Sequence, residues 1–158
     1  MRRSDTAMRR QDYIQLVEDQ YFGNVTAGNI DAVCACFTAD ATITILHGDN
    51  PPRRFFAQPT AGELHLSEFW RHLCAHYEAR FEHYDHVIDV DAKRCAATFT
   101  VTLSPKPGSP YATRGTLTLR NCNFFWLRDS LIERMTVYYA NPDTGGTATG
   151  KPTGYPPA

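Results

Sequence analysis

Four of the chain's six histidines fall within one short stretch, HLCAHYEARFEHYDH, at positions 72–86. Imidazole titrates near physiological pH, so such a stretch could transfer protons or bind a metal ion. His72 and His76 stand four apart, which on a helix lets two side chains share one metal. The glutamate of the zinc-binding HEXXH motif is missing, because Leu73 follows His72. We therefore expect this pair to be a solvated helix flank, and we predict no bound metal.

The other two histidines lie where the sequence pattern changes from helix to strand. Alternation places Tyr84, His86, Ile88 and Val90 on one strand face, the more apolar of the two, so His86 should point toward the interior. His83 stands at the junction of helix and strand. A neutral imidazole in an apolar pocket can accept a proton near pH 7. Each of these two histidines is a candidate general base, and a hydrogen-bonded structural role is the alternative for each.

Composition limits the classes of function. The chain has 158 residues, 42% of them hydrophobic and 12% aromatic, which favours one domain with a packed core. Its net charge is −1 and no stretch is strongly basic, which argues against nucleic acid as a partner. No apolar run approaches the roughly 20 residues that span a bilayer, and the start MRRSDTAMRR lacks the apolar segment of a signal peptide. We therefore expect a soluble, cytoplasmic protein. Five cysteines without a Cys-x-x-Cys pair indicate neither a disulfide framework nor a zinc ribbon.

Apolar periodicity predicts the elements that must position these histidines. Helices are expected at 9–27, 30–37 and 66–81, and strands at 41–46, 55–58, 84–91, 95–104, 112–127 and 131–140. Helices followed by long alternating strands are typical of an α+β fold. We expect a basic, flexible N-terminus at 1–10, one domain at 11–141 and a Gly/Thr/Pro-rich tail at 142–158.

Two motifs resemble a known superfamily. YFGNVTAGNIDAVCACFTADATITI (21–45) resembles the opening of the nuclear transport factor 2-like superfamily, and FWLRDSLIERMTVYYAN (125–141) is similar to its final hairpin. SnoaL-like polyketide cyclases, ketosteroid isomerases, scytalone dehydratases and limonene epoxide hydrolases belong to it. The resemblance covers roughly residues 10–141. It implies an α+β fold with a strongly bent antiparallel sheet wrapped around three N-terminal helices, forming a cone with an apolar pocket.

The hairpin resemblance implies which side chains of the long strand face inward. It places Phe125 inward, and period two then carries Asn123 and Asn121 to the same face. A buried amide without a partner costs about 1–3 kcal/mol, so each needs a hydrogen bond. Asn123 could bind a substrate carbonyl or satisfy a bulge, and for Asn121 a structural role is favoured.

The resemblance also implies that Thr136, Tyr138 and Ala140 of the last strand face the pocket. Related epoxide hydrolases carry an aspartate where Ala140 stands, so this chemistry is not expected. His83 resembles the base of some dehydratases and dehydrochlorinases. Its acid partner would have to be another residue, such as Asp40 or Asp85.

These features lead to a functional hypothesis. We expect an isomerase, dehydratase or cyclase that acts on a small, apolar, carbonyl-bearing substrate. No cofactor is expected, because no glycine-rich phosphate loop is present. The expected catalytic residues are His83, His86 and Tyr138, and the expected substrate-binding residues are Tyr13, Trp70, Phe99, Asn121, Asn123 and Phe125. The alternative is a non-catalytic ligand-binding or interaction domain of the same fold.

One further expectation concerns assembly. On the long strand, Phe124 and Trp126 alternate with the inward residues and should point outward. Exposed aromatic pairs on a sheet are typical of interfaces. We therefore expect a homodimer that packs through the outer face of the sheet.

Overall fold

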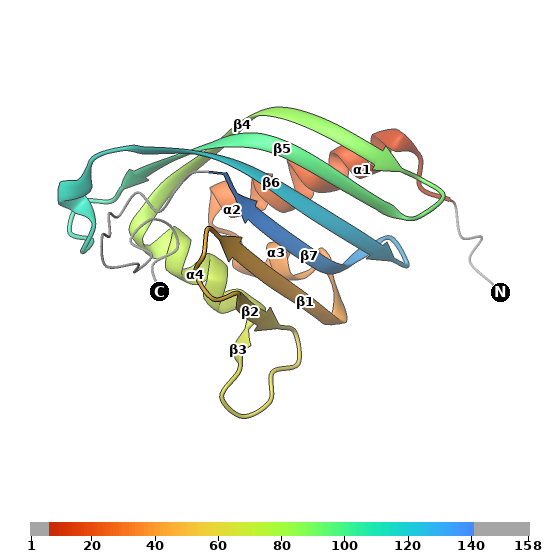
Figure 1. Ribbon diagram of the computed structural model, residues 1–158, viewed down its shortest axis with the longest axis horizontal. Helices are drawn as coiled ribbons and strands as arrows, with labels where there is room; N and C mark the ends of the chain where they lie inside the picture. Colours follow the sequence, from red (N-terminus) through yellow and green to blue (C-terminus); the bar gives the residue numbers. More distant parts are fainter. Residues whose placement is uncertain (1–6, 141–158) are drawn as a thin grey trace.

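A strongly bent sheet packs against helices on its inner face in the computed structural model, which describes residues 7–140 (Figure 1). The expected α+β architecture is confirmed. The expected tail at 142–158 and most of the expected N-terminal segment lie outside the described residues. No helix within 7–140 is both long enough and apolar enough to cross a membrane.

The first helix runs from Arg10 to Ala27, close to the expected 9–27. It consists of α1 (Arg10–Gln15), the π-helical segment η1 (Leu16–Phe22) and α2 (Gly23–Ala27). Gly28 ends it in a left-handed conformation, with a φ of +71°, which glycine adopts without steric strain. The short helix α3 (Ile30–Cys34) follows, and the side chain of Asn29 caps it by accepting a hydrogen bond from the amide of Ala32.

Seven strands form one sheet in the order β3-β2-β1-β7-β6-β5-β4. They are β1 (Phe37–His47), β2 (Arg53–Phe56), β3 (Leu64–His65), β4 (Tyr77–Asp89), β5 (Arg94–Pro105), β6 (Leu117–Arg128) and β7 (Leu131–Tyr139), and the short turn η2 (Ala112–Arg114) precedes β6. Neighbours from β7 to β4 are antiparallel, as are β1 and β2, whereas β1 pairs with β7 and β2 pairs with β3 in parallel.

The helix expected at 66–81 is shorter than predicted. Helix α4 (Leu66–His76) ends at His76, and Tyr77 already begins β4. The boundary was misplaced because Leu73, Tyr77 and Phe81 are spaced four apart. Residues four apart share a face in a helix and also in a strand, so this spacing does not distinguish the two.

Two extra residues, one in β4 and one in β7, invert the alternation of these strands. In β4, Glu82 pairs with Thr100 but Asp85 pairs with Thr98, so His83 belongs to a bulge and has a φ of +57°. Tyr84 and His86 consequently face the helices, as expected for His86, while His83 is exposed.

The bulge in β7 overturns one expectation. Trp126 pairs with Arg134 whereas Leu127 pairs with Ile132, so Glu133 is the extra residue. Beyond it, Met135, Val137 and Tyr139 are buried. The expectation that Thr136, Tyr138 and Ala140 face the pocket is therefore wrong: Tyr138 is 44% exposed on the outer face, and Tyr139 takes the inward position.

This assignment predicts different effects for two adjacent tyrosines. Tyr139→Ala should destabilise the protein by about 3–5 kcal/mol, as truncation of a buried aromatic ring does. Tyr138→Ala should cost less than about 1 kcal/mol, because its ring is largely solvated. Urea unfolding, at a protein concentration too low for self-association, measures both. Equal losses would show that the bulge at Glu133 is misplaced.

Candidate functional site

A small cavity lies at the centre of the fold, between η1, α4 and the inner face of the sheet. Its volume is about 20 Å³, enough for about one water molecule. Its walls are mostly aromatic and apolar: Tyr21, Phe22, Val25, Phe69, Trp70, Leu73, Phe81, Phe99, Val101, Asn121, Asn123, Val137 and Tyr139. Four of the expected substrate-binding residues, Trp70, Phe99, Asn121 and Asn123, therefore meet here. Phe125 is fully buried behind Tyr21, with ring centroids 5.8 Å apart.

Three polar groups of the cavity wall could bind a ligand: the hydroxyl of Tyr21 as a donor, and the side-chain oxygens of Asn121 and Asn123 as acceptors. The indole Nε1 of Trp70 donates to Oη of Tyr21 at 3.2 Å, which leaves the Tyr21 proton free to be donated. Burial raises the pKa of Tyr21, so its hydroxyl stays protonated. Oδ1 of Asn121 and Oδ1 of Asn123 are buried and have no hydrogen-bond partner among residues 7–140. Tyr21 was not predicted as a site residue, although it is the first residue of the motif at 21–45.

A larger hollow of about 720 Å³ lies beside this cavity, bordered by the ends of α2 and α4 and by β4 and β5. Val25 and Leu73 line both spaces. These two side chains therefore lie between the central cavity and this larger hollow, which we call the vestibule.

His86 forms a hydrogen bond with a residue that the sequence did not single out. Its Nε2 lies 2.6 Å from Oε2 of Glu18 on η1, and the two side chains are 8% and 33% exposed. A carboxylate oxygen accepts, so Nε2 carries the imidazole proton and donates a hydrogen bond to Oε2 of Glu18. Nδ1 then holds a lone pair, and this atom is buried without a partner within the described chain. The acids considered from sequence lie elsewhere: Asp40 pairs with Arg128, and Asp85 is exposed.

Strand register relates His86 to Asn123. Both are paired with Ala97, from β4 on one side and from β6 on the other. Neighbouring strands are about 4.8 Å apart, so the backbones of His86 and Asn123 are about 10 Å apart with only a methyl group between them. His86 itself lines none of the cavities described here. The Tyr84 ring stacks on it at 5.8 Å and also contacts Phe99 of the cavity wall at 6.1 Å.

The other two expected catalytic residues lie on the opposite face of the sheet. His83 and Tyr138 both border a shallow hollow of about 360 Å³, together with Arg120 and Cys122. Neither of them lines the central cavity, although Phe99, Asn121 and Tyr139 line both that cavity and this hollow, and His86 lines neither space.

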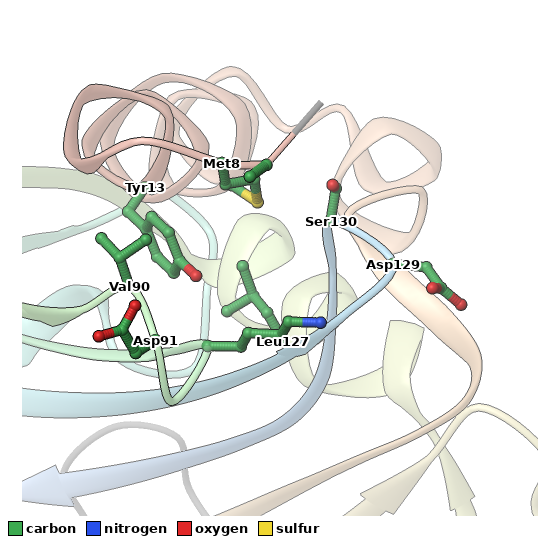
Figure 2. A pocket seen from close by; sticks show the side chains of 9 residues that line it. Met8, Tyr13, Val90, Asp91, Leu127, Asp129 and Ser130 are labelled. Atoms are coloured by element: carbon green, nitrogen blue, oxygen red, sulfur yellow. The ribbon is translucent and has the colours of Figure 1, made fainter. Parts of the chain in front are cut away.

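Tyr13, the remaining expected binding residue, lies in a separate pocket of about 390 Å³. We call it the end pocket, and it is lined by Ala7, Met8, Tyr13, Val90, Asp91, Lys93, Leu127, Asp129 and Ser130 (Figure 2).

His72 and His76 are half-buried rather than fully solvated, which corrects the sequence-based expectation. Their rings lie 4.6 Å apart, and both contact Tyr111 of the connection before β6. Burial, and secondly the neighbouring His76 and Arg53, lower the pKa of His72. Within residues 7–140, no group of three or more His, Cys, Asp or Glu side chains is placed to hold a metal ion.

The chain is similar in sequence and structure to SnoaL-like and polyketide cyclase-like proteins. A family described as SnoaL-like domain matches residues 19–135. A candidate polyketide cyclase from Xanthomonas campestris pv. campestris is 24% identical, with 82% of this chain and 91% of that chain covered and a TM-score of 0.63. Another from Silicibacter sp. TM1040 is 26% identical over 84% and 91% of the chains, with a TM-score of 0.61. An epoxide hydrolase/cyclase-like enzyme of pyran ring formation in salinomycin is 21% identical over 82% and 92%, with a TM-score of 0.62. No curated protein sequence gives a significant match.

The lowered pKa of His72 predicts a pH dependence of stability. Between its lowered pKa and the ordinary value near 6.5, the unfolded chain binds more protons than the folded one, so the free energy of unfolding falls as the pH falls. His72→Gln should reduce this loss, measured by urea unfolding at pH 7.5, 6.5 and 5.5. His83→Gln, at an exposed histidine, is the control. If His72→Gln loses as much free energy of unfolding between pH 7.5 and pH 5.5 as the parent does, His72 is not the source of the pH dependence.

Proposed function

The chain belongs to the family of SnoaL-like domains, and we propose that it is a cofactor-independent isomerase, dehydratase or cyclase acting on a small, apolar carbonyl compound. The observation that carries this proposal is the pairing of His86 with Glu18. A base held by a carboxylate, with its second nitrogen unused, is the arrangement found where imidazole takes a proton from substrate. We assign Nδ1 of His86 as the general base and Glu18 as the residue that orients it.

Tyr21 supplies the complementary group. Its free O–H could donate to a substrate carbonyl, and that hydrogen bond strengthens as negative charge develops on the oxygen during proton abstraction. Glu18 and Tyr21 stand three apart on η1, so one helical segment positions both the partner of the base and the donor. The amide oxygens of Asn121 and Asn123 could accept hydrogen bonds from a substrate hydroxyl or an enol.

Substrate binding requires the central cavity to widen. The Tyr84 ring contacts both His86 and Phe99 of the cavity wall, and Val25 and Leu73 line both the cavity and the vestibule. We propose that movement of Tyr84 opens Nδ1 of His86 to the substrate, which enters past Val25 and Leu73.

The small size of the cavity favours a second candidate function. A space of about 20 Å³ suits a closed core, so a non-catalytic ligand-binding or interaction domain is the alternative. The two candidates differ in whether the protein accelerates proton transfer.

The test is hydrogen–deuterium exchange next to the carbonyl of a panel of ketones in D2O, followed by proton NMR. The protein should accelerate exchange of at least one ketone over buffer. His86→Gln, which keeps a donor for Glu18 but removes the base, should lower this acceleration by about 10²–10⁴-fold.

The comparison variant is His83→Gln, at the other candidate histidine, which should keep the acceleration. Loss in His83→Gln with retention in His86→Gln would identify His83 as the base instead. Glu18→Gln should lower the rate less than His86→Gln, and it should change the tautomer of His86, read from its side-chain ¹⁵N shifts. Absence of acceleration for every ketone would favour the non-catalytic candidate.

We also propose a homodimer through the outer face of the sheet. Phe124 is 40% exposed and its ring lies 5.7 Å from that of Tyr138 and 6.1 Å from that of Trp126. The Arg134 guanidinium lies 3.9 Å from the centre of the Trp126 ring. Aromatic rings and arginine are the residue types enriched at interfaces.

Light scattering at micromolar concentration should give the mass of two protomers. Phe124→Asp should give the mass of one, because it places a charge in the centre of the apolar contact. Leu64→Asp, at an exposed leucine on β3, is the control and should stay dimeric. A monomeric mass for the unmodified protein would rule out the dimer.

A further inference from the structure

We propose that the end pocket is a second binding site, for a small neutral compound with an apolar body and a carbonyl group. It lies where the turn between β4 and β5 and the turn between β6 and β7 meet the start of α1 (Figure 2). Its volume of about 390 Å³ falls in the usual range of small-molecule sites, roughly 300–1,000 Å³. This space is open without any rearrangement, unlike the central cavity.

Tyr13 gives the pocket a fixed hydrogen-bond donor. The residue is only 2% exposed, and its hydroxyl makes no hydrogen bond to any residue in the range 7–140. Figure 2 shows the ring extending from α1 with its hydroxyl directed toward Leu127. Burial, and secondly Cys95 and Asp89, raise the pKa of Tyr13, so the group remains a donor at neutral pH. A buried tyrosine usually satisfies its hydroxyl, and here the free direction faces the pocket.

Three turn residues at the rim of the pocket have a backbone conformation that favours glycine. Four non-glycine residues have positive φ between positions 7 and 140, and three of them, Lys93, Asp129 and Ser130, line this pocket, with φ values of +55°, +52° and +64°. Glycine adopts this conformation at the least cost and is favoured in such hairpin turns. Lysine and serine there are strained, and both place a polar side chain at the pocket where glycine would place none.

The charges and walls define the ligand class. Met8, Val90, Leu127 and the Tyr13 ring form apolar walls, which suit a hydrocarbon body. Lys93 is offset by Asp91, and Figure 2 shows the carboxylate of Asp129 directed away from the pocket. The site therefore has little net charge and favours a neutral ligand. The hydroxyls of Tyr13 and Ser130 can donate to an acceptor oxygen, which a carbonyl provides.

The experiment uses two probes that differ only in this group, the bicyclic ketone α-tetralone and the hydrocarbon tetralin, titrated into ¹⁵N-labelled protein. Amide shifts on adding α-tetralone should centre on Tyr13, Lys93, Leu127 and Ser130. Tyr13→Phe should weaken α-tetralone binding roughly three- to tenfold, the effect of one neutral hydrogen bond, and leave tetralin binding unchanged.

Ser130→Gly provides a second variant that should fold better than the parent. Its melting temperature should rise, because glycine relieves the positive φ, while α-tetralone binding weakens roughly two- to fivefold. Shifts centred on Asn121, Asn123 and Trp70 would place the ketone in the central cavity and overturn the proposal. Equal binding of both probes, or unchanged binding by Tyr13→Phe, would also overturn it. Binding in the end pocket does not depend on His86. The titration therefore tests this proposal separately from the exchange experiment, which tests the proposed catalytic function.

Discussion

A strand places successive side chains on opposite faces of a sheet, and the interior of this protein depends on two interruptions of that rule. His83 in β4 and Glu133 in β7 are each one residue too many for the partner strand. Beyond the first, His86 turns toward the helices and reaches Glu18. Beyond the second, Tyr139 rather than Tyr138 enters the core. Without these bulges, the His86 side chain that bonds to Glu18 and one wall of the central cavity would point to the outer face of the sheet.

The helices are held over this face by aromatic packing and one buried hydrogen bond. The Tyr21 ring contacts Phe22, Phe37, Trp70 and Phe125 edge-on, with centroids 4.6–6.1 Å apart. Trp70 on α4 donates to Tyr21 on η1, which joins two helices far apart in the sequence. Because Tyr21 is the acceptor in this bond, the interaction that joins the helices also leaves its hydroxyl proton available to another acceptor.

The sequence was sufficient for the fold and for part of the site. Helical periodicity identified the first helix almost to its ends, and the long alternating strands with the two quoted motifs indicated the bent sheet. The inward positions of His86, Asn121, Asn123 and Phe125 were also predictable. The outward direction of Tyr138 was not predictable, because a one-residue bulge leaves no signal in the apolar pattern. The pairing of Glu18 with His86 was not predictable either, because contact between a helix and an edge strand depends on how the two elements cross.

Three buried hydrogen-bond acceptors help to decide whether the interior of this protein is purely structural or also binds a ligand. Nδ1 of His86 and the Oδ1 atoms of Asn121 and Asn123 have no partner within residues 7–140. Each such atom costs about 1–3 kcal/mol, against a net stability of about 5–15 kcal/mol for a typical domain, and apolar residues of similar shape would avoid this cost. Packing alone therefore gives no reason for these side chains. His86 and Asn123 flank Ala97 in one cross-strand row on the inner face, so a ligand with two donor groups could pair with both once Tyr84 moves. The same polar atoms that weaken the closed core are the ones that a bound substrate would pair, and this favours a binding interior over a purely structural one.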